Sequence, residues 1–184
     1  MEAYSTFVKK LVNAFESEDL EYAFTGALAV SFYGVPRTTT DVDIIVAVSD
    51  KTDTKSKITV VLRRAGLQID ERKIEMALTS SYPIATFKDK KTPYSVDIIF
   101  FRGKLERISG RISGVKTFFQ SPEGLIVAKL RMIKATIPVE RAIKDKDDVK
   151  AILAFTKVDI EAVKKQAKKD KTLEIFQEIM SENL

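Results

Sequence analysis

The chain has 184 residues, of which 45% are hydrophobic and 31% charged, with a formal net charge of +5 and neither cysteine nor histidine. This length fits one domain, or one compact domain with a helical extension. Without cysteine and histidine there are no disulfides, thiolate or imidazole zinc sites, Ser-His-Asp triads or cysteine nucleophiles, so any metal must be held by oxygen ligands, which favours Mg²⁺ or Mn²⁺.

The first residues lack the basic and apolar regions of a signal peptide. The longest mostly apolar run, residues 23–35, is too short to cross a bilayer and is broken by glycines. We therefore expect a cytoplasmic protein with no membrane partner.

In the first part of the chain, the spacing of apolar residues predicts alternating helices and strands. Thr25 can cap the second helix, and Pro36 with the threonines at 38–40 favours an extended loop over a longer helix. The predicted elements are a helix over 3–17, a strand over 22–24, a helix over 26–33 and a strand over 41–48.

In the middle of the chain, a turn at 49–53 carries helix-capping residues, and Gly66 ends the helix that follows. Residues 89–93 join two strands as a hairpin. The predicted elements are this helix, a short helix over 71–78 and strands over 84–88, 94–101 and 115–119.

The last third is predicted to be helical. Ser121 at the N-cap and Pro122 at the first helical position begin its first helix, and Pro138 breaks the chain after it. Further helices are predicted over 139–155, 159–169 and 172–180. We expect a mixed α/β core over residues 1–120 and a C-terminal helical part, residues 121–184, packed on it.

Two aspartates begin the strand predicted over 41–48. Successive side chains of a strand alternate between its faces, so Asp41 and Asp43 stand on one face of an otherwise apolar strand. Carboxylates this close repel each other, and burying them without a partner is unfavourable. A bound divalent cation relieves both effects, so the pair indicates a metal site.

A third aspartate, Asp97, interrupts the apolar strand over 94–101. A strand this apolar is expected to be central, beside the strand of Asp41 and Asp43, so that three carboxylates converge. Three carboxylates that bind two cations suit in-line displacement at phosphorus. The alternative is that Asp97 is a strand-end or turn carboxylate.

Gly26 begins the helix after the first strand. A glycine there lets a phosphate approach the backbone, and a helix N-terminus favours negative charge. Small residues also permit close helix packing, so Gly26 alone is a weak indication of a phosphate site. Its value lies in the spacing, because thirteen residues separate Ala27 from Asp41.

These residues resemble a known signature. Gly26-Ala27, the Asp-Val-Asp at 41–43 and Asp97 match the hydrophobic-Gly-(Gly/Ser)…Asp-hydrophobic-Asp pattern of the DNA polymerase β-like nucleotidyltransferase superfamily. The chain is similar to its small prokaryotic members, which include abortive-infection toxin-like nucleotidyltransferases. Ala27 departs from the usual glycine or serine, so one hydroxyl contact with phosphate is lost.

The resemblance covers residues 24–101 and extends more weakly through 121–130 and 144–149. It implies a mixed, mostly antiparallel sheet flanked by helices, and transfer of an NMP from an NTP with Mg²⁺. The acceptor is a protein, an RNA or a small molecule, and a toxin-antitoxin role implies a partner protein.

The resemblance also implies roles for single residues. Asp41 and Asp43 bind the metals, and Asp97 completes the metal site and serves as general base. Gly26, Ala27 and the loop residues Arg37 and Thr38 are candidates for nucleotide contacts.

Arg37 lies four residues before Asp41, where it reaches a phosphate or forms a salt bridge that fixes the loop. Lys129 lies in an apolar helix stretch and either pairs with the triphosphate or extends to solvent. Asp145 and Asp148 either orient these cations or belong to a solvated acidic cluster, which is the more common case.

Three functions remain open. A Mg²⁺-dependent nucleotidyltransferase is the leading interpretation. An inactive nucleotide-binding or interaction module is the second, against which the retention of three carboxylates argues. The third is an RNA-binding protein, because residues 102–184 hold 18 Lys and Arg against 12 Asp and Glu. Lys-rich helices that simply solvate their outer faces explain this charge equally well.

Overall fold

The computed structural model describes residues 2–37, 39–138 and 142–182. The chain divides into two compact units. The first unit comprises residues 1–28 and 38–120, and the second comprises residues 29–37 and 121–184.

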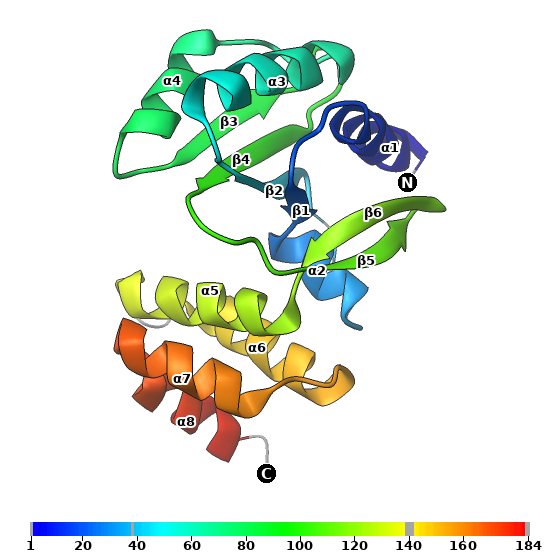
Figure 1. The fold of residues 1–184 in the computed structure, drawn as a ribbon. Coiled ribbons are helices and arrows are strands. Elements are labelled where there is room, and N and C mark those ends of the chain that lie inside the picture. Colours follow the sequence, from blue (N-terminus) through cyan, green and yellow to red (C-terminus); the bar gives the residue numbers. More distant parts are fainter. Residues whose placement is uncertain (1, 38, 139–141, 183–184) are drawn as a thin grey trace. The chain divides into compact units, whose positions relative to one another are not determined.

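The first unit is built on a six-stranded sheet with the order β3-β4-β2-β1-β6-β5 (Figure 1). The pairs β2–β4 and β1–β6 are parallel, and the pairs β1–β2, β3–β4 and β5–β6 are antiparallel. The sheet is therefore mixed and mostly antiparallel, which confirms the expected fold class. The strands are β1 (Tyr22–Phe24), β2 (Asp41–Ala47), β3 (Ile84–Lys88), β4 (Ser95–Phe101), β5 (Arg107–Ile112) and β6 (Val115–Gln120).

One face of the sheet packs against helices of the same unit. Every second residue of the central strand β2 is fully buried: Val42, Ile44 and Val46. Tyr22 pairs with Val46 in the neighbouring strand, and its ring centroid lies 4.8 Å from that of Phe15 in the first helix. Strand alternation therefore directs Asp41 and Asp43 to the opposite face. The helices of this unit are α1 (Glu2–Glu16), α3 (Lys51–Arg64) and α4 (Glu71–Thr79), while α2 (Gly26–Phe32) begins in this unit and ends in the second.

Aspartates cap two of these helices. Asp50 accepts a hydrogen bond from the backbone N–H of Asp53 at the start of α3, and Asp70 accepts two at the start of α4. Each carboxylate accepts hydrogen bonds from N–H groups that the first turn leaves unpaired. Its negative charge also interacts favourably with the positive end of the helix dipole. The helix α3 therefore begins within the predicted turn at 49–53.

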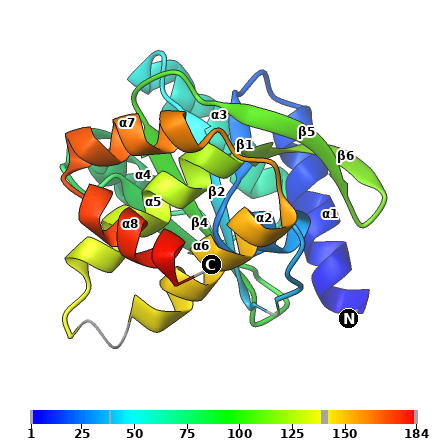
Figure 2. The same ribbon diagram turned by 90° about the horizontal axis from the view of Figure 1, so that it is seen from below.

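β5 is an element that the sequence patterns did not predict. It pairs with β6 through a two-residue turn at Ser113 and Gly114, whose φ angles of 49° and 83° suit a type I′ hairpin. β5 lies at the edge of the sheet, beside β6 in both views (Figures 1 and 2), and has no fully buried residue. Its apolar alternation is therefore weak. The sequence feature that could have predicted the hairpin is the Ser-Gly pair between Ile112 and Val115.

Besides the end of α2, the described residues of the second unit form four helices, with α7 beside both α5 and α8 (Figure 2). Ser121 caps α5 by accepting from the N–H of Gly124, and Pro122 occupies the first turn as predicted. Part of the helix predicted over 139–155 lies outside the described residues, and the described helix begins at Ile143. The helices are α5 (Pro122–Ala135), α6 (Ile143–Phe155), α7 (Ile160–Asp170) and α8 (Leu173–Ser181).

No helix in the described ranges combines the length and the apolar composition needed to cross a bilayer.

Candidate active site

The register between β2 and β4 places the predicted carboxylates together in the sheet. Asp43 is the direct partner of Asp97, and Asp41 is the direct partner of Ser95. Paired residues on neighbouring strands point to the same face, and so do residues two apart on one strand. Asp41, Asp43 and Asp97 therefore share one face, the one opposite the fully buried face of β2.

Hydroxyl groups orient two of these carboxylates. Ser95 Oγ donates to Asp41 Oδ1 at 2.8 Å, and Thr86 Oγ1 donates to Asp97 Oδ1 at 2.6 Å. Thr86 lies on β3 as the register partner of Asp97. Strands β2, β3 and β4 therefore each contribute a polar side chain to this part of the sheet.

Gly26 lies against the carboxylate of Asp43. Its φ of +57° is in the left-handed region, which a residue without a Cβ adopts readily. A Cβ on Gly26 would stand 2.7 Å from Asp43 Cγ and overlap Oδ2. The N–H of Thr25 donates to the backbone oxygen of Asp43 at 2.9 Å. The turn between β1 and α2 is thus shaped to admit the Asp43 side chain, while phosphate contacts at Gly26 and Ala27 remain a prediction.

The donor chemistry of this face fits a hard divalent cation. Asp43 and Asp97 occupy directly paired positions on strands spaced about 4.8 Å apart, where two carboxylates repel each other unless a cation lies near them. Carboxylate oxygens are the ligands that Mg²⁺ and Mn²⁺ prefer. Among the described residues, however, no group of three or more acidic side chains is gathered closely enough to hold a metal ion. The convergence of all three carboxylates on a cation therefore remains a prediction.

Solved structures resemble this chain over most or all of its length. No protein-family model and no curated protein matches it. The solution structure of the antibiotic-resistance factor ANT(2'')-Ia is similar, with a TM-score of 0.69 at 12% identity over 100% of this chain and 99% of that one. The crystal structure of ANT(2'')-Ia in complex with adenylyl-2''-tobramycin gives a TM-score of 0.60 at 12% identity, over 99% of both chains.

A third solved structure is an antigenic nucleotidyltransferase-like protein from Paracoccidioides brasiliensis, with a TM-score of 0.59 at 17% identity over 92% of each chain. The chain has the nucleotidyltransferase fold. At these identities the likeness shows the fold alone.

The two cationic side chains that the sequence singled out, Arg37 and Lys129, both lie in the second unit. Arg37 pairs with Asp148 Oδ1, and Lys129 Nζ lies 2.6 Å from Asp148 Oδ2. Lys129 Nζ also lies 2.8 Å from Asp145 Oδ1. Asp148 is buried, so the acidic pair on α6 is part of an ion cluster and not a solvated acidic surface. The predicted nucleotide contact Thr38 lies outside the described residues.

Two residues near the carboxylates were not predicted from the sequence. Ser95 stands two residues before Asp97, so strand alternation was a signal that both share a face. Thr86 carried no such signal, because its place beside Asp97 depends on the antiparallel pairing of β3 with β4.

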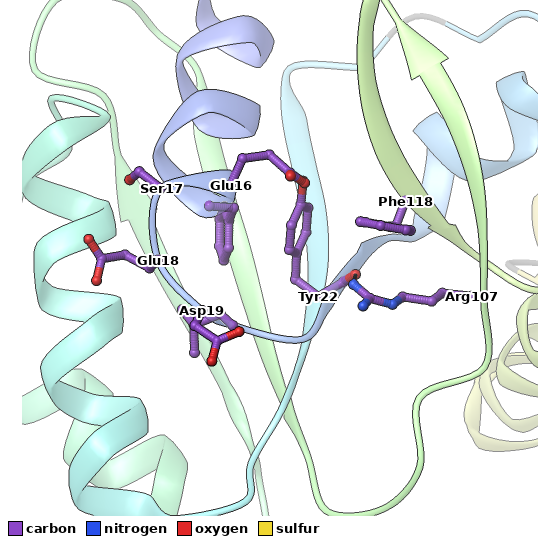
Figure 3. A pocket seen from close by; sticks show the side chains of 9 residues that line it. Glu16, Ser17, Glu18, Asp19, Tyr22, Arg107 and Phe118 are labelled. Carbon is purple, nitrogen blue, oxygen red and sulfur yellow. Dashed lines mark hydrogen bonds between the residues drawn. The ribbon is translucent and has the colours of Figure 1, made fainter.

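A pocket of about 420 Å³ lies at the other end of β1 from Gly26 and contains none of the predicted site residues (Figure 3). Three of the charged side chains that line it, Glu16, Glu18 and Arg107, already have partners. The Arg107 guanidinium lies 3.9 Å from the centre of the Phe118 ring and donates to the backbone oxygen of Tyr22. The Tyr22 hydroxyl donates to Glu16 at 2.6 Å, and burial raises the pKa of this hydroxyl above its usual range. Glu18 pairs with Arg64 at 2.8 Å, so we do not assign the active site to this pocket.

Proposed function

We propose that the chain transfers a nucleoside monophosphate from an NTP to an acceptor hydroxyl, using Mg²⁺ or Mn²⁺ at Asp41, Asp43 and Asp97. The observation that carries this proposal is the pairing of Asp43 with Asp97 in neighbouring parallel strands, with Asp41 on the same face. The similarity to solved nucleotidyltransferase structures supports it.

In this proposal the side chains divide the work of one displacement. Asp41 and Asp43 would hold the cation, which when bound neutralises charge on the phosphates. Asp97, oriented through Oδ1 by Thr86, would accept the proton of the acceptor hydroxyl. The acceptor oxygen forms a bond to the α-phosphorus, the bond from that phosphorus to the bridging oxygen breaks, and pyrophosphate leaves.

The acceptor class is the open part of the proposal. One of the similar structures holds adenylyl-2''-tobramycin, the adenylylated product of an aminoglycoside. An aminoglycoside is therefore included in the acceptor panel beside total RNA and total protein. A protein or RNA acceptor agrees with the toxin role that the sequence resemblance implies.

The test is incubation of the protein with each α-labelled NTP, Mg²⁺ and the acceptor panel. We expect the label to be transferred, and Asp43→Asn to lower the rate by roughly 10²- to 10³-fold, because several kcal/mol of charge stabilisation is lost. Asp19→Asn is the matched control. This substitution makes the same charge change, but Asp19 lines the pocket at the other end of β1.

Other outcomes favour the other functions. NTP binding without label transfer to any acceptor would indicate an inactive nucleotide-binding module. Salt-sensitive RNA retention that Asp43→Asn leaves unchanged would indicate an RNA-binding protein. A toxin role predicts that induced expression arrests growth and that Asp43→Asn restores it.

A further inference from the structure

The hydroxyl group of Tyr4 is buried and has no hydrogen-bond partner among the described residues. Within residues 2–37, 39–138 and 142–182 it is the one buried side-chain hydroxyl of which this is true. The buried hydroxyl of Tyr22 is the usual case, because it donates to Glu16 at 2.6 Å and lies 2.8 Å from Thr117 Oγ1. Burying a donor without a partner destabilises a fold, so the Tyr4 hydroxyl requires an explanation.

Packed aromatic rings fix the place of this side chain. Tyr4 belongs to the first turn of α1, and its ring centroid lies 5.2 Å from that of Tyr94 in an edge-to-face arrangement. The Tyr94 ring also lies 5.5 Å from that of Phe7, one turn further along α1. Tyr94 directly precedes Ser95, whose hydroxyl donates to Asp41. Tyr4 is therefore held at the end of the sheet where β2 and β4 begin, and all of these residues belong to the first unit.

The carboxylates of the candidate site act on this hydroxyl. Burial is the main cause that raises the pKa of Tyr4 to about 12, and the negative charges of Asp43 and Asp41 add to it. The interaction between charges falls with distance, so these two carboxylates lie near enough to affect the proton of Tyr4. The hydroxyl therefore keeps its proton at neutral pH and is available as a hydrogen-bond donor.

A hard cation at these carboxylates would supply the oxygen that this donor lacks. Mg²⁺ retains several water molecules when one or two carboxylates bind it. Groups that donate to the ligands of a metal ion orient those ligands and strengthen its binding. Hydroxyl groups already donate to two of the three candidate carboxylates, and Tyr4 places a further hydroxyl at the same end of the sheet.

Packing alone does not explain why a tyrosine occupies this position. The aromatic contact with Tyr94 is made by the ring, and a phenylalanine would make it without burying an unpaired donor. Proteins retain locally unfavourable groups chiefly at functional sites. The hydroxyl therefore points to a role in the candidate site beside it.

We propose that Tyr4 is a positioning residue of the cation site, and that its hydroxyl donates a hydrogen bond to an oxygen ligand of a divalent cation held by Asp41 and Asp43. The inference rests on the proposed function, because that function places the cation at these carboxylates. It predicts two effects of opposite sign when this one oxygen atom is removed: a more stable protein without the cation, and weaker binding of the cation.

The first measurement is thermal unfolding in the presence of a chelator. Tyr4→Phe should raise the melting temperature by roughly 2–8 °C, because it removes a buried donor that has no partner. Tyr22→Phe is the matched buried control and should lower the melting temperature, because Glu16 and Thr117 then lose a hydrogen-bond partner. Tyr82→Phe is the exposed control and should leave it unchanged, since Tyr82 is 69% exposed.

The second measurement is titration with Mn²⁺ alone, in which electron paramagnetic resonance reports the free ion. Tyr4→Phe should bind Mn²⁺ roughly ten- to a hundredfold more weakly than the wild type, as expected when a group that supports the metal ligands is lost. Tyr22→Phe and Tyr82→Phe should bind it as the wild type does. Asp43→Asn, which removes a carboxylate ligand, should abolish binding at this site.

The inference requires both effects of Tyr4→Phe. If the melting temperature does not rise, the hydroxyl is not an unfavourable buried group in the folded protein, and the inference is overturned. If Tyr4→Phe binds Mn²⁺ as tightly as the two tyrosine controls, the hydroxyl does not support the cation, and the inference is overturned as well.

The two proposals fail in distinguishable ways. If the wild type does not bind Mn²⁺, or if Asp43→Asn binds it equally well, the proposed cation site fails and the inference fails with it. If Asp43→Asn abolishes both Mn²⁺ binding and label transfer, while Tyr4→Phe binds Mn²⁺ as the wild type does, the proposed function stands and only the inference fails.

Discussion

The contact between Gly26 and Asp43 makes Gly26→Ala the most informative single substitution. An alanine Cβ would overlap Asp43 Oδ2 and stand 2.7 Å from Cγ, so the carboxylate would have to rotate away. That rotation would move it relative to its partner Asp97 on β4. We therefore expect Gly26→Ala to impair nucleotidyl transfer beyond any effect on folding.

The magnitude has two parts that a control separates. Placing alanine at φ +57° costs about 1–2 kcal/mol of unfolding free energy, because the left-handed conformation brings Cβ close to the carbonyl oxygen. Gly114 has a similar φ of +83°, but a Cβ at this position would meet no atom within 4 Å. Gly114→Ala should therefore share the backbone cost, about 2–8 °C in melting temperature, without any effect on Asp43.

The assays are thermal unfolding and label transfer at a temperature where both variants are folded. Gly26→Ala should lose roughly ten- to a hundredfold in transfer rate, as expected when a catalytic group is displaced by about 1 Å. Gly114→Ala should keep the wild-type rate. If Gly26→Ala also keeps it, the position of the Asp43 carboxylate does not matter for transfer, and the proposed site is wrong.

Three further predictions concern single side chains of the first unit. Thr86→Val removes the hydrogen-bond donor to Asp97 and should slow label transfer. It should change the unfolding free energy by no more than about 0.5 kcal/mol, because Thr86 is exposed. An unchanged transfer rate would show that this hydrogen bond is not needed. Burial, with nearby carboxylates, raises the pKa of Tyr4 to about 12, so the folded state keeps a proton that the unfolded state loses above pH 10. Stability in urea should therefore fall as the pH rises from 10 to 12, and a Tyr4→Phe variant with the same slope would contradict this. Asp89→Ala should lower the unfolding free energy by about 1.5–3 kcal/mol, because a carboxylate that accepts from the N–H and hydroxyl of Thr92 is lost, and chemical denaturation would measure it.

Local signals in the sequence accounted for most helices and for the central strands. Apolar spacing predicted α1, whose buried residues include Phe7, Leu11 and Phe15 at that spacing. Ser121 and Pro122 marked the start of α5 because capping depends on residues a few positions apart. β5 was missed because an exposed edge strand has little apolar alternation to detect.

The sequence by itself determined that a metal site in this chain would have oxygen ligands only. It also determined that Asp41 and Asp43 lie on one face of a strand, because alternation is a local property of the backbone. Only the tertiary structure decided that Asp97 stands directly beside Asp43, that Thr86 and Ser95 orient the carboxylates, and that a buried Asp148 joins Arg37 to Lys129. These contacts join residues distant in the chain, and they depend on strand order, register and helix packing, which no local pattern specifies.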